Sequence, residues 1–463
     1  MFASKGRRRF VPVELASGAM LVALGLAELH CGNTSTPGAG GGGSAAAGGA
    51  GAGTATAGQA AAGASNNGGG GGGNSSGGNG NAGVSGGANT TGGAAGTASV
   101  GGTGGGGGAA GGSSAGGSSG AGGGSPTLAT CTTEATETPP ALKKTPVVRL
   151  PGDDQAGEVL GAPGEPGIYV LGHRSGKVYY AVDNKLDPTP MATVAVKNNK
   201  GQDEQGLLSI AFHPQFAQNH LFYLLYTAPN ANIRIDELER TSVTSSKSTG
   251  KVIWDKPRAG GGEFHNGGQI AFNPKDNGKL LLYHSVGNNS SVAQSGMAEG
   301  VAGRVLVHDL AGPEGNGSTL GYGLRNPYRM TIDRLTGGMF IGETDDPPGG
   351  AVYYSAYDNP VKDYGYRGGN IKDGITGHEG DKAMIGGVVY RGSKIPGACG
   401  RYFYSNWPSG VIKSIVVKDG KLQGQAFTHT GLGLANLDSF GEDGEGEMYI
   451  ATQGGEVYKV EAQ

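Results

Sequence analysis

One histidine and one arginine–asparagine pair are the residues of this chain whose types and setting best suit chemistry. His265 lies in a polar turn, residues 263–266, that runs into a strand-like segment. Further along the chain, Arg325 and Asn326 stand directly before Pro327. A neutral imidazole accepts a proton near pH 7, and a guanidinium binds carboxylates through forked, charge-assisted bonds. These residue types suit proton transfer beside a bound anion.

Short strands must position these residues, because helical periodicity is almost absent. A strand rich in aromatic and β-branched residues, a polar turn with glycine and a second strand recur six times, at intervals of roughly 45–65 residues, the spacing of a propeller blade. A β-sandwich is the alternative, but its strands would not group into hairpins at this long period. The sequence predicts an all-β fold, a six-bladed β-propeller of four-stranded blades. The copies begin at residues 167, 221, 280, 338, 401 and 447.

The last predicted hairpin ends the chain, and one strand-like segment, residues 146–150, precedes the first hairpin. We expect this segment to pair into the last blade and close the ring. Closure leaves only short, protected sheet edges, which an all-β chain needs.

The amino-terminal residues 1–31 are predicted to be a signal peptide. A basic start is followed by an apolar run, residues 15–27, that is too short to span a bilayer comfortably. Cys31 follows this run and suggests a lipoprotein, although His30 stands where such signals usually carry a small residue; an ordinary cleaved signal is the alternative. We expect an exported protein, either a cell-envelope or outer-membrane lipoprotein or a secreted one, with membrane contact only through a lipid on Cys31.

A spacer and one folded domain are predicted to follow. Residues 32–126 are Gly mixed with Ala, Ser, Asn and Thr, a composition that cannot offset the entropy of ordering. We expect them to be a disordered linker. Residues 139–463 are enough for one large all-β domain.

Cysteine content and charge argue against a disulfide-framework protein, a cysteine-ligated metal site and a nucleic-acid-binding protein. Beyond Cys31 only Cys131 and Cys399 remain; they are too few for a disulfide framework and lack metal-site spacing. In an oxidising compartment the two could pair and attach the lead-in segment to the domain. The formal net charge of −3 and the absence of a basic patch give no case for nucleic acid.

Four motifs in order resemble one known family. They are residues 206–216, the His265 segment, the Arg325 segment, and the pair of segments 385–392 and 437–443. Together they are similar to the PQQ-dependent soluble sugar dehydrogenases, the glucose/sorbosone dehydrogenase family of β-propellers. The last two segments look closest to the Hedgehog-interacting-protein branch, whose members are binding proteins.

The resemblance implies roles for individual residues. His265 takes the role of the base that removes the proton from a sugar's C1 hydroxyl while hydride moves to PQQ. Arg325 and Asn326 take cofactor-binding roles, as do Gln205 and Arg391, the latter standing where the enzymes have a lysine. The family also implies Ca²⁺ as a Lewis acid with oxygen ligands, a sugar substrate and an electron acceptor that the sequence does not name. A turn histidine and a structural Arg-Asn-Pro turn are the alternatives.

Several positions depart from the enzyme pattern. Glu204 stands where the enzymes have a glutamine, and a carboxylate facing an anionic cofactor repels it. Asn288 replaces the aspartate that orients the histidine; it can accept a hydrogen bond but adds no charge. Asp345 and Asp346 offer carboxylates for the metal, with a plain acidic surface turn as the alternative. Residues 434–437 lack the arginine pair of the last blade.

Two functions therefore compete. The first is an exported, PQQ-dependent aldose sugar dehydrogenase. The second is a non-catalytic binding propeller of the same family that recognises a protein or glycan at the cell surface. A calcium-dependent hydrolase on a six-bladed propeller is a third possibility, but no spacing of acidic residues requires it.

Overall fold

A computed structural model describes the folded part of the chain. The described residues lie in one compact unit, so the predicted signal peptide, the spacer and Cys31 are outside them. No helix among the described residues is long and apolar enough to cross a membrane. The described ranges are 131–132, 134–198, 204–258, 262–291, 300–313, 317–344, 350–359, 361–366, 374–376, 383–407 and 409–463.

The all-β prediction is confirmed: strands make up almost all regular structure in the described part, with two short helical turns, α1 (Phe216–Asn219) and η1 (Pro274–Asp276). Four of the five sheets each take consecutive stretches of chain, with one short strand added to the second. The first contains β7 (Leu207–Phe212), β8 (Leu221–Thr227), β9 (Asn232–Ser242) and β10 (Ser245–Pro257). The second contains β11 (Gly267–Phe272), β12 (Leu281–Val286), β13 (Arg304–Asp309), β14 (Ser318–Tyr322) and β18 (Lys362–Asp363).

The next two sheets have three and four strands. One contains β15 (Pro327–Ile332), β16 (Met339–Glu343) and β17 (Ala351–Ser355), and the other contains β19 (Ala383–Val389), β20 (Arg401–Trp407), β21 (Ile412–Lys418) and β22 (Lys421–Thr428). Neighbouring strands within each of these two sheets are antiparallel. This is the hairpin pattern that the recurrent strand–turn–strand segments predict.

The fifth sheet joins the two ends of the domain. One side holds β2 (Ala156–Gly161), β3 (Ile168–Gly172), β4 (Lys177–Val182), β5 (Lys185–Leu186) and β6 (Ala192–Thr193). The other side holds β23 (Leu437–Glu442), β24 (Met448–Thr452), β25 (Glu456–Ala462) and β1 (Leu142–Arg149). Strand β1 pairs antiparallel with β25, so the predicted pairing of the lead-in strand with the last hairpin is confirmed.

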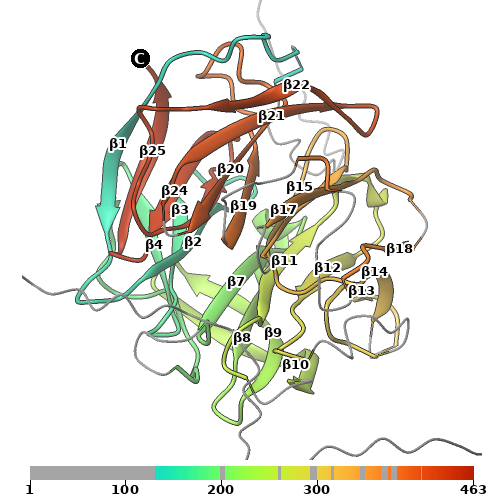
Figure 1. The fold of residues 1–463 in the computed structure, drawn as a ribbon. Helices are drawn as coiled ribbons and strands as arrows, with labels where there is room; N and C mark the ends of the chain where they lie inside the picture. The colour runs from blue at the N-terminus through green and yellow to red at the C-terminus, as the bar shows by residue number, and fades with distance from the viewer. Residues whose placement is uncertain are drawn as a thin grey trace, which may run out of the picture. The chain divides into compact units, whose positions relative to one another are not determined.

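The first strand of each hairpin group lies innermost. Strands β2, β7, β11, β15, β19 and β23 contact one another in succession, and β23 returns to β2. Figure 1 shows β7, β11, β15 and β19 toward the middle of the domain and β10 and β22 at its edges. All six residues of β7 are buried, whereas β22 is mostly exposed. The inner strand β7 is therefore much more buried than the outer strand β22, and the site residues come from the turns at the ends of the inner strands.

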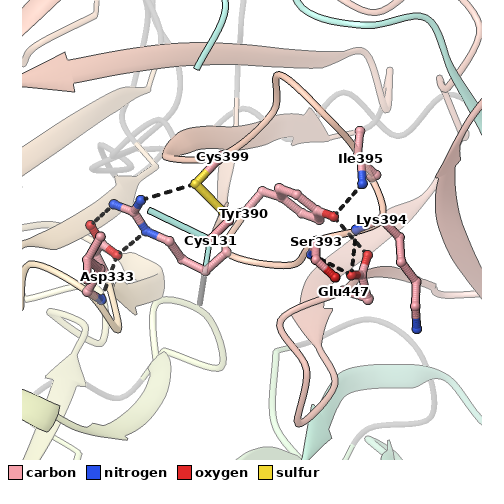
Figure 2. Close-up of a disulfide and its surroundings, with 10 residues drawn as sticks. Cys131, Asp333, Tyr390, Ser393, Lys394, Ile395, Cys399 and Glu447 are labelled. Atoms are coloured by element: carbon pink, nitrogen blue, oxygen red, sulfur yellow. Dashed lines mark hydrogen bonds and ion pairs between the residues drawn. A yellow bond between two sulfur atoms is a disulfide. The ribbon is translucent and has the colours of Figure 1, made fainter. Parts of the chain in front are cut away.

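A disulfide attaches the lead-in segment to the domain. Cys131 is bonded to Cys399 across a sequence separation of 268 residues, and the Cys131 N–H donates to the Arg391 carbonyl at 2.9 Å. Figure 2 shows the bond between the two labelled cysteines, and Arg391 Nη1 lies 3.7 Å from Cys399 Sγ. The suggested pairing of these two cysteines is confirmed by this bond.

Buried histidines make the fold sensitive to acid. Burial lowers the pKa of His308 and that of His429 to about 4, so the unfolded chain binds protons that the folded chain does not. Stability is full above pH 6.5 and is lost as pH falls toward 4; we expect a loss of about 2 kcal/mol per histidine by pH 5. Urea unfolding of wild type and His308→Asn at pH 7.5 and pH 5 tests this. The two proteins should differ in their pH dependence, and parallel losses of stability would contradict the assignment to His308.

Candidate functional site

The backbone of His265 is held in an unusual conformation. His265 lies in the turn two residues before strand β11 and has φ +60°, in the left-handed region that costs an L-residue roughly 1–2 kcal/mol. Its carbonyl accepts hydrogen bonds from the backbone N–H and the side-chain amide of Asn289, each at 2.9 Å. A Cβ atom at Gly287 would lie 2.1 Å from the same carbonyl. The neighbouring loop therefore packs directly against the histidine backbone, and only glycine fits there.

Asn288 fixes the tautomer of the His265 ring. His265 Nδ1 lies 3.0 Å from Asn288 Oδ1, and the Ser290 backbone N–H donates to that same oxygen at 2.9 Å. The Ser290 N–H identifies the Asn288 atom as the carbonyl oxygen, since an amide nitrogen cannot accept. His265 Nδ1 must then carry the proton and donate it, which makes Nε2 the nitrogen that accepts one. The structure thus places Asn288 where an orienting residue is predicted.

Glu204 lies against the same turn. Its carboxylate accepts the N–H of His265 at 2.9 Å, the N–H of Asn266 at 3.3 Å, and the Asn326 side-chain amide at 3.1 and 3.2 Å. Burial raises the pKa of Glu204, and the hydrogen bonds from Asn266, Asn326 and His265 oppose that rise. The negative charge of Glu204 predicts repulsion of an anionic ligand, but these bonds hold the carboxylate against the His265 turn.

The Arg325–Asn326 turn meets the histidine turn. Asn326 Oδ1 accepts the Gly267 N–H at 3.0 Å, and the Arg325 carbonyl accepts the Asn288 N–H at 2.7 Å. Glu343 secures this turn, because its Oε1 accepts the backbone N–H of Arg325 at 2.6 Å and of Asn326 at 2.8 Å. His265, Asn288, Arg325 and Asn326 therefore come together at one end of the inner strands.

Gln205 lies beside the same turn, but its contact is with another side chain. With its amide oriented to satisfy its neighbours, the oxygen accepts from Arg258 Nη1 at 2.6 Å and Nη2 at 2.9 Å. Arg258 Nη1 is also 3.5 Å from Asn266 Oδ1. Sequence reasoning missed Arg258 and Glu343, which match no motif; Arg258 comes right after β10, and Glu343 lies at the end of β16. Their roles follow only from which loops meet in space.

Arg391 is not brought to this site. Its guanidinium donates two bonds to Asp333, from Nε to Oδ1 at 2.7 Å and from Nη2 to Oδ2 at 2.6 Å. Asp333 follows the end of β15, whereas Arg325 precedes its start. The six residues of that strand separate the two positions by about 20 Å. The predicted cofactor contact of Arg391 is corrected: the side chain forms a buried structural ion pair.

A buried arginine lies among the inner strands two residues into β15. Arg329 Nη1 donates to the carbonyls of Leu208 and Gly268, both at 3.0 Å, and Nη2 donates to the carbonyl of Gly157 at 2.5 Å. Nη2 also lies 3.4 Å from Asp438 Oδ2. One side chain of β15 thus connects β7, β11, β2 and β23 close beneath the His265 turn.

The predicted metal ligands Asp345 and Asp346 lie outside the described residues. Among the described residues, no group of three or more His, Cys, Asp or Glu side chains is arranged to hold a metal ion. The calcium prediction therefore stays a prediction.

Comparison with known proteins identifies the family. Residues 163–366, which contain the whole His265 and Arg325 cluster, match the family model described as Glucose / Sorbosone dehydrogenase. These residues are therefore similar to the glucose/sorbosone dehydrogenase family. This family assignment supports an oxidoreductase at the level of class. An uncharacterised protein of Synechocystis is 27% identical over 137 residues, a match that covers 28% of this chain and only 33% of that relative's length.

Solved structures of two aldose sugar dehydrogenases share the fold. A PQQ-bound aldose sugar dehydrogenase from Streptomyces coelicolor aligns with a TM-score of 0.56 and 19% identity, over 70% of this chain and 99% of its own. The apo-form of a soluble aldose sugar dehydrogenase from Escherichia coli gives a TM-score of 0.56 and 15% identity, over 70% and 100%. At these identities the likeness shows the propeller-like fold alone.

Asn288 offers a sharp test of the histidine geometry. In Asn288→Asp, the carboxylate keeps the bonds to His265 and Ser290 and adds a negative charge that stabilises the imidazolium. If His265 acts as a base, we expect turnover at neutral pH to rise roughly tenfold. Asn288→Ala removes the acceptor of Nδ1–H and should lower turnover. Steady-state rates of the three proteins measure the effect, and an unchanged rate in both variants would exclude an orienting role for Asn288.

Proposed function

We propose that this protein is a PQQ-dependent aldose sugar dehydrogenase that oxidises the C1 hydroxyl of its sugar. The observation that carries the proposal is the fixed His265 ring, whose Nδ1–H is held by Asn288 Oδ1 at 3.0 Å. The ring lies in the same loop cluster as Arg325 and Asn326. The family match supports the reaction class.

His265 Nε2 accepts the C1 hydroxyl proton, while Asn288 stabilises the imidazolium that forms by keeping its bond to Nδ1–H. When bound, PQQ would accept the hydride from C1, that is, the hydrogen together with its two bonding electrons. The sugar leaves as the lactone, since it has lost one proton and one hydride. A positioned base contributes a factor of about 10²–10⁴ to such a step.

The residues present fit an anionic quinone. Arg325, at the site, and Arg258, beside Gln205, are two guanidiniums from different loops, and guanidiniums suit the three carboxylates of PQQ. The Glu204 carboxylate, beside His265, accepts bonds from two backbone N–H groups and one amide. Arg325 and Asn326 are therefore proposed to hold the cofactor, with Gln205 keeping Arg258 in place.

Further parts of the proposal rest on sequence. We propose that the five sheets are six blades, with the nine-stranded sheet counting as two. We also propose that Asp345 and Asp346 help to bind Ca²⁺. The protein is exported in this proposal, either as a lipoprotein with its lipid on Cys31 or as a secreted protein. An electron acceptor, which the sequence does not name, would reoxidise the reduced cofactor.

A titration of the full chain with PQQ and Ca²⁺ tests the proposed function. Absorbance and calorimetry should show saturable, calcium-dependent binding near one PQQ per chain, and a screen of aldoses with a reducible dye should then find turnover. The absence of PQQ binding at tens of micromolar would overturn the proposal.

A binding propeller is the second candidate. The specific observation in its favour is at the last sheet, where residues 434–437 lack an arginine pair and Asp438 is bonded to Tyr328 and Arg329. Strand β23 therefore carries carboxylates, Asp438 and Glu442, and no cation. The likeness of segments 385–392 and 437–443 to the Hedgehog-interacting-protein branch points the same way. PQQ binding with turnover would exclude this candidate.

A further inference from the structure

We propose that Glu204 is a positioning residue that holds the base His265 in its reactive geometry by binding the backbone of the histidine turn. The catalytic part of this inference rests on the proposed dehydrogenase function. Glu204 acts through the backbone of His265, and it is the position at which this chain departs from the glutamine of the enzymes.

Three consecutive backbone N–H groups of the turn are bound by side chains from other loops. Glu204 accepts those of His265 and Asn266 at 2.9 and 3.3 Å, and Asn326 Oδ1 accepts that of Gly267 at 3.0 Å. The Asn326 amide in turn donates to both Glu204 oxygens at 3.1 and 3.2 Å. Successive N–H groups around a left-handed residue form a concavity that favours an anion. The Glu204 carboxylate occupies that concavity.

The turn needs this support because its histidine is left-handed. His265 has φ +60° and Gly267 has φ +73°, and the non-glycine residue relaxes to ordinary backbone angles unless its neighbours prevent it. Relaxation would swing the ring away from Asn288 Oδ1. A misplacement of about 1 Å in a catalytic group lowers the rate by roughly a hundredfold. Glu204 therefore affects kcat more than substrate affinity.

The same arrangement occurs at two other turns, which makes a matched control available. Glu343 binds the backbone N–H groups of Arg325 and Asn326 in the site itself. Glu447 binds those of Ser393 and Lys394 at 2.8 and 3.0 Å, beyond the opposite end of the inner strands. Figure 2 shows Glu447 with these partners and Tyr390. Glu447 shares the structural duty of Glu204 but lies far from His265.

The burial of Glu204 supports a pH signature. Burial raises the pKa of its carboxyl group, so protonation in mild acid weakens the binding of the two N–H groups. Glu204→Gln keeps one oxygen acceptor and does not titrate. If Glu204 positions the histidine, this variant should lack the part of the acid decline that comes from Glu204.

The experiment compares Glu204→Ala, Glu204→Gln and Glu447→Gln in the full-length protein. Nitrogen-15 NMR of the cofactor-free protein should show the His265 ring as the Nδ1–H tautomer in wild type and Glu204→Gln, and as a mixture in Glu204→Ala. In the loaded enzyme, Glu204→Ala should lower kcat about a hundredfold with KM changed less than threefold. Glu447→Gln should lower the melting temperature and leave kcat and the His265 tautomer unchanged.

The outcomes separate the two proposals. An unchanged His265 tautomer in Glu204→Ala would overturn the positioning role whether or not the protein turns over sugar. A wild type without turnover but with the tautomer lost in Glu204→Ala would overturn the dehydrogenase and keep the positioning role. Equal losses of kcat in Glu204→Ala and Glu447→Gln would show a general stability effect and overturn the inference.

Discussion

Replacement of His265 by alanine is expected to lower kcat by about 10²–10⁴-fold, because the step then loses its positioned base. PQQ binding should change little, since the proposed clamp residues Arg325 and Asn326 keep their own bonds to Glu343. Steady-state dye reduction with aldoses measures kcat, and calorimetry measures cofactor affinity. Equal rates in wild type and His265→Ala would remove His265 from the mechanism.

His213 provides the matched control for this substitution. It also lies in a turn at the end of an inner strand, but it follows β7 instead of preceding β11, and its Nδ1 accepts the Gln215 N–H at 2.9 Å. The His213 ring therefore caps the turn that follows β7. His213→Asn should therefore keep full turnover with a small loss of stability. A rate loss as large as that of His265→Ala would show that the effect is not local to the base.

The sequence predicted the fold where the residue pattern is local, as in the hairpins, or where two segments of the same kind had no other partner. The lead-in strand pairs with β25 because a strand-forming segment before the first hairpin and an unpaired final hairpin complete each other's hydrogen bonds. The Cys131–Cys399 bond was suggested by two cysteines that lack the spacing of a metal site and are too few for a disulfide framework. The four-residue α1 was not predicted, because a single turn leaves no periodic pattern.

The site was predicted in part, and its errors have a physical cause. Resemblance to the family's motifs selected His265, Asn288, Arg325 and Asn326, which the fold brings together. It also selected Arg391, because a sequence does not show which end of a strand a side chain occupies or that Asp333, 58 residues away, neutralises it.

Glu204 shows the converse error. Its charge suggested repulsion, but whether a carboxylate repels a ligand or binds N–H groups depends on the neighbouring loops. Those loops come from residues 265–266 and 326, which are distant in the sequence.

Replacement of Arg329 by methionine is expected to destabilise the fold by about 3–5 kcal/mol, the usual result of removing one member of a buried ion pair. The guanidinium is the common donor to carbonyls of β7, β11 and β2, and it neutralises Asp438 on β23. Methionine fills similar space but leaves these acceptors and a buried carboxylate without their partner. The loss should appear as a lower urea midpoint with an unchanged slope.

Two companion variants make this result specific. Arg149→Met removes an exposed pair with Glu456, whose members are 62% and 32% exposed, and should cost less than about 1 kcal/mol. Asp438→Asn on top of Arg329→Met removes the unpaired charge and should recover part of the loss, because residues in one network are not additive. Such recovery assigns the cost to the stranded carboxylate, whereas a double variant less stable than Arg329→Met would assign it to the carbonyls. Equal losses of stability in Arg329→Met and Arg149→Met would contradict a central role for Arg329. The inner strands next to the His265 turn would then be held together without a contribution from this arginine.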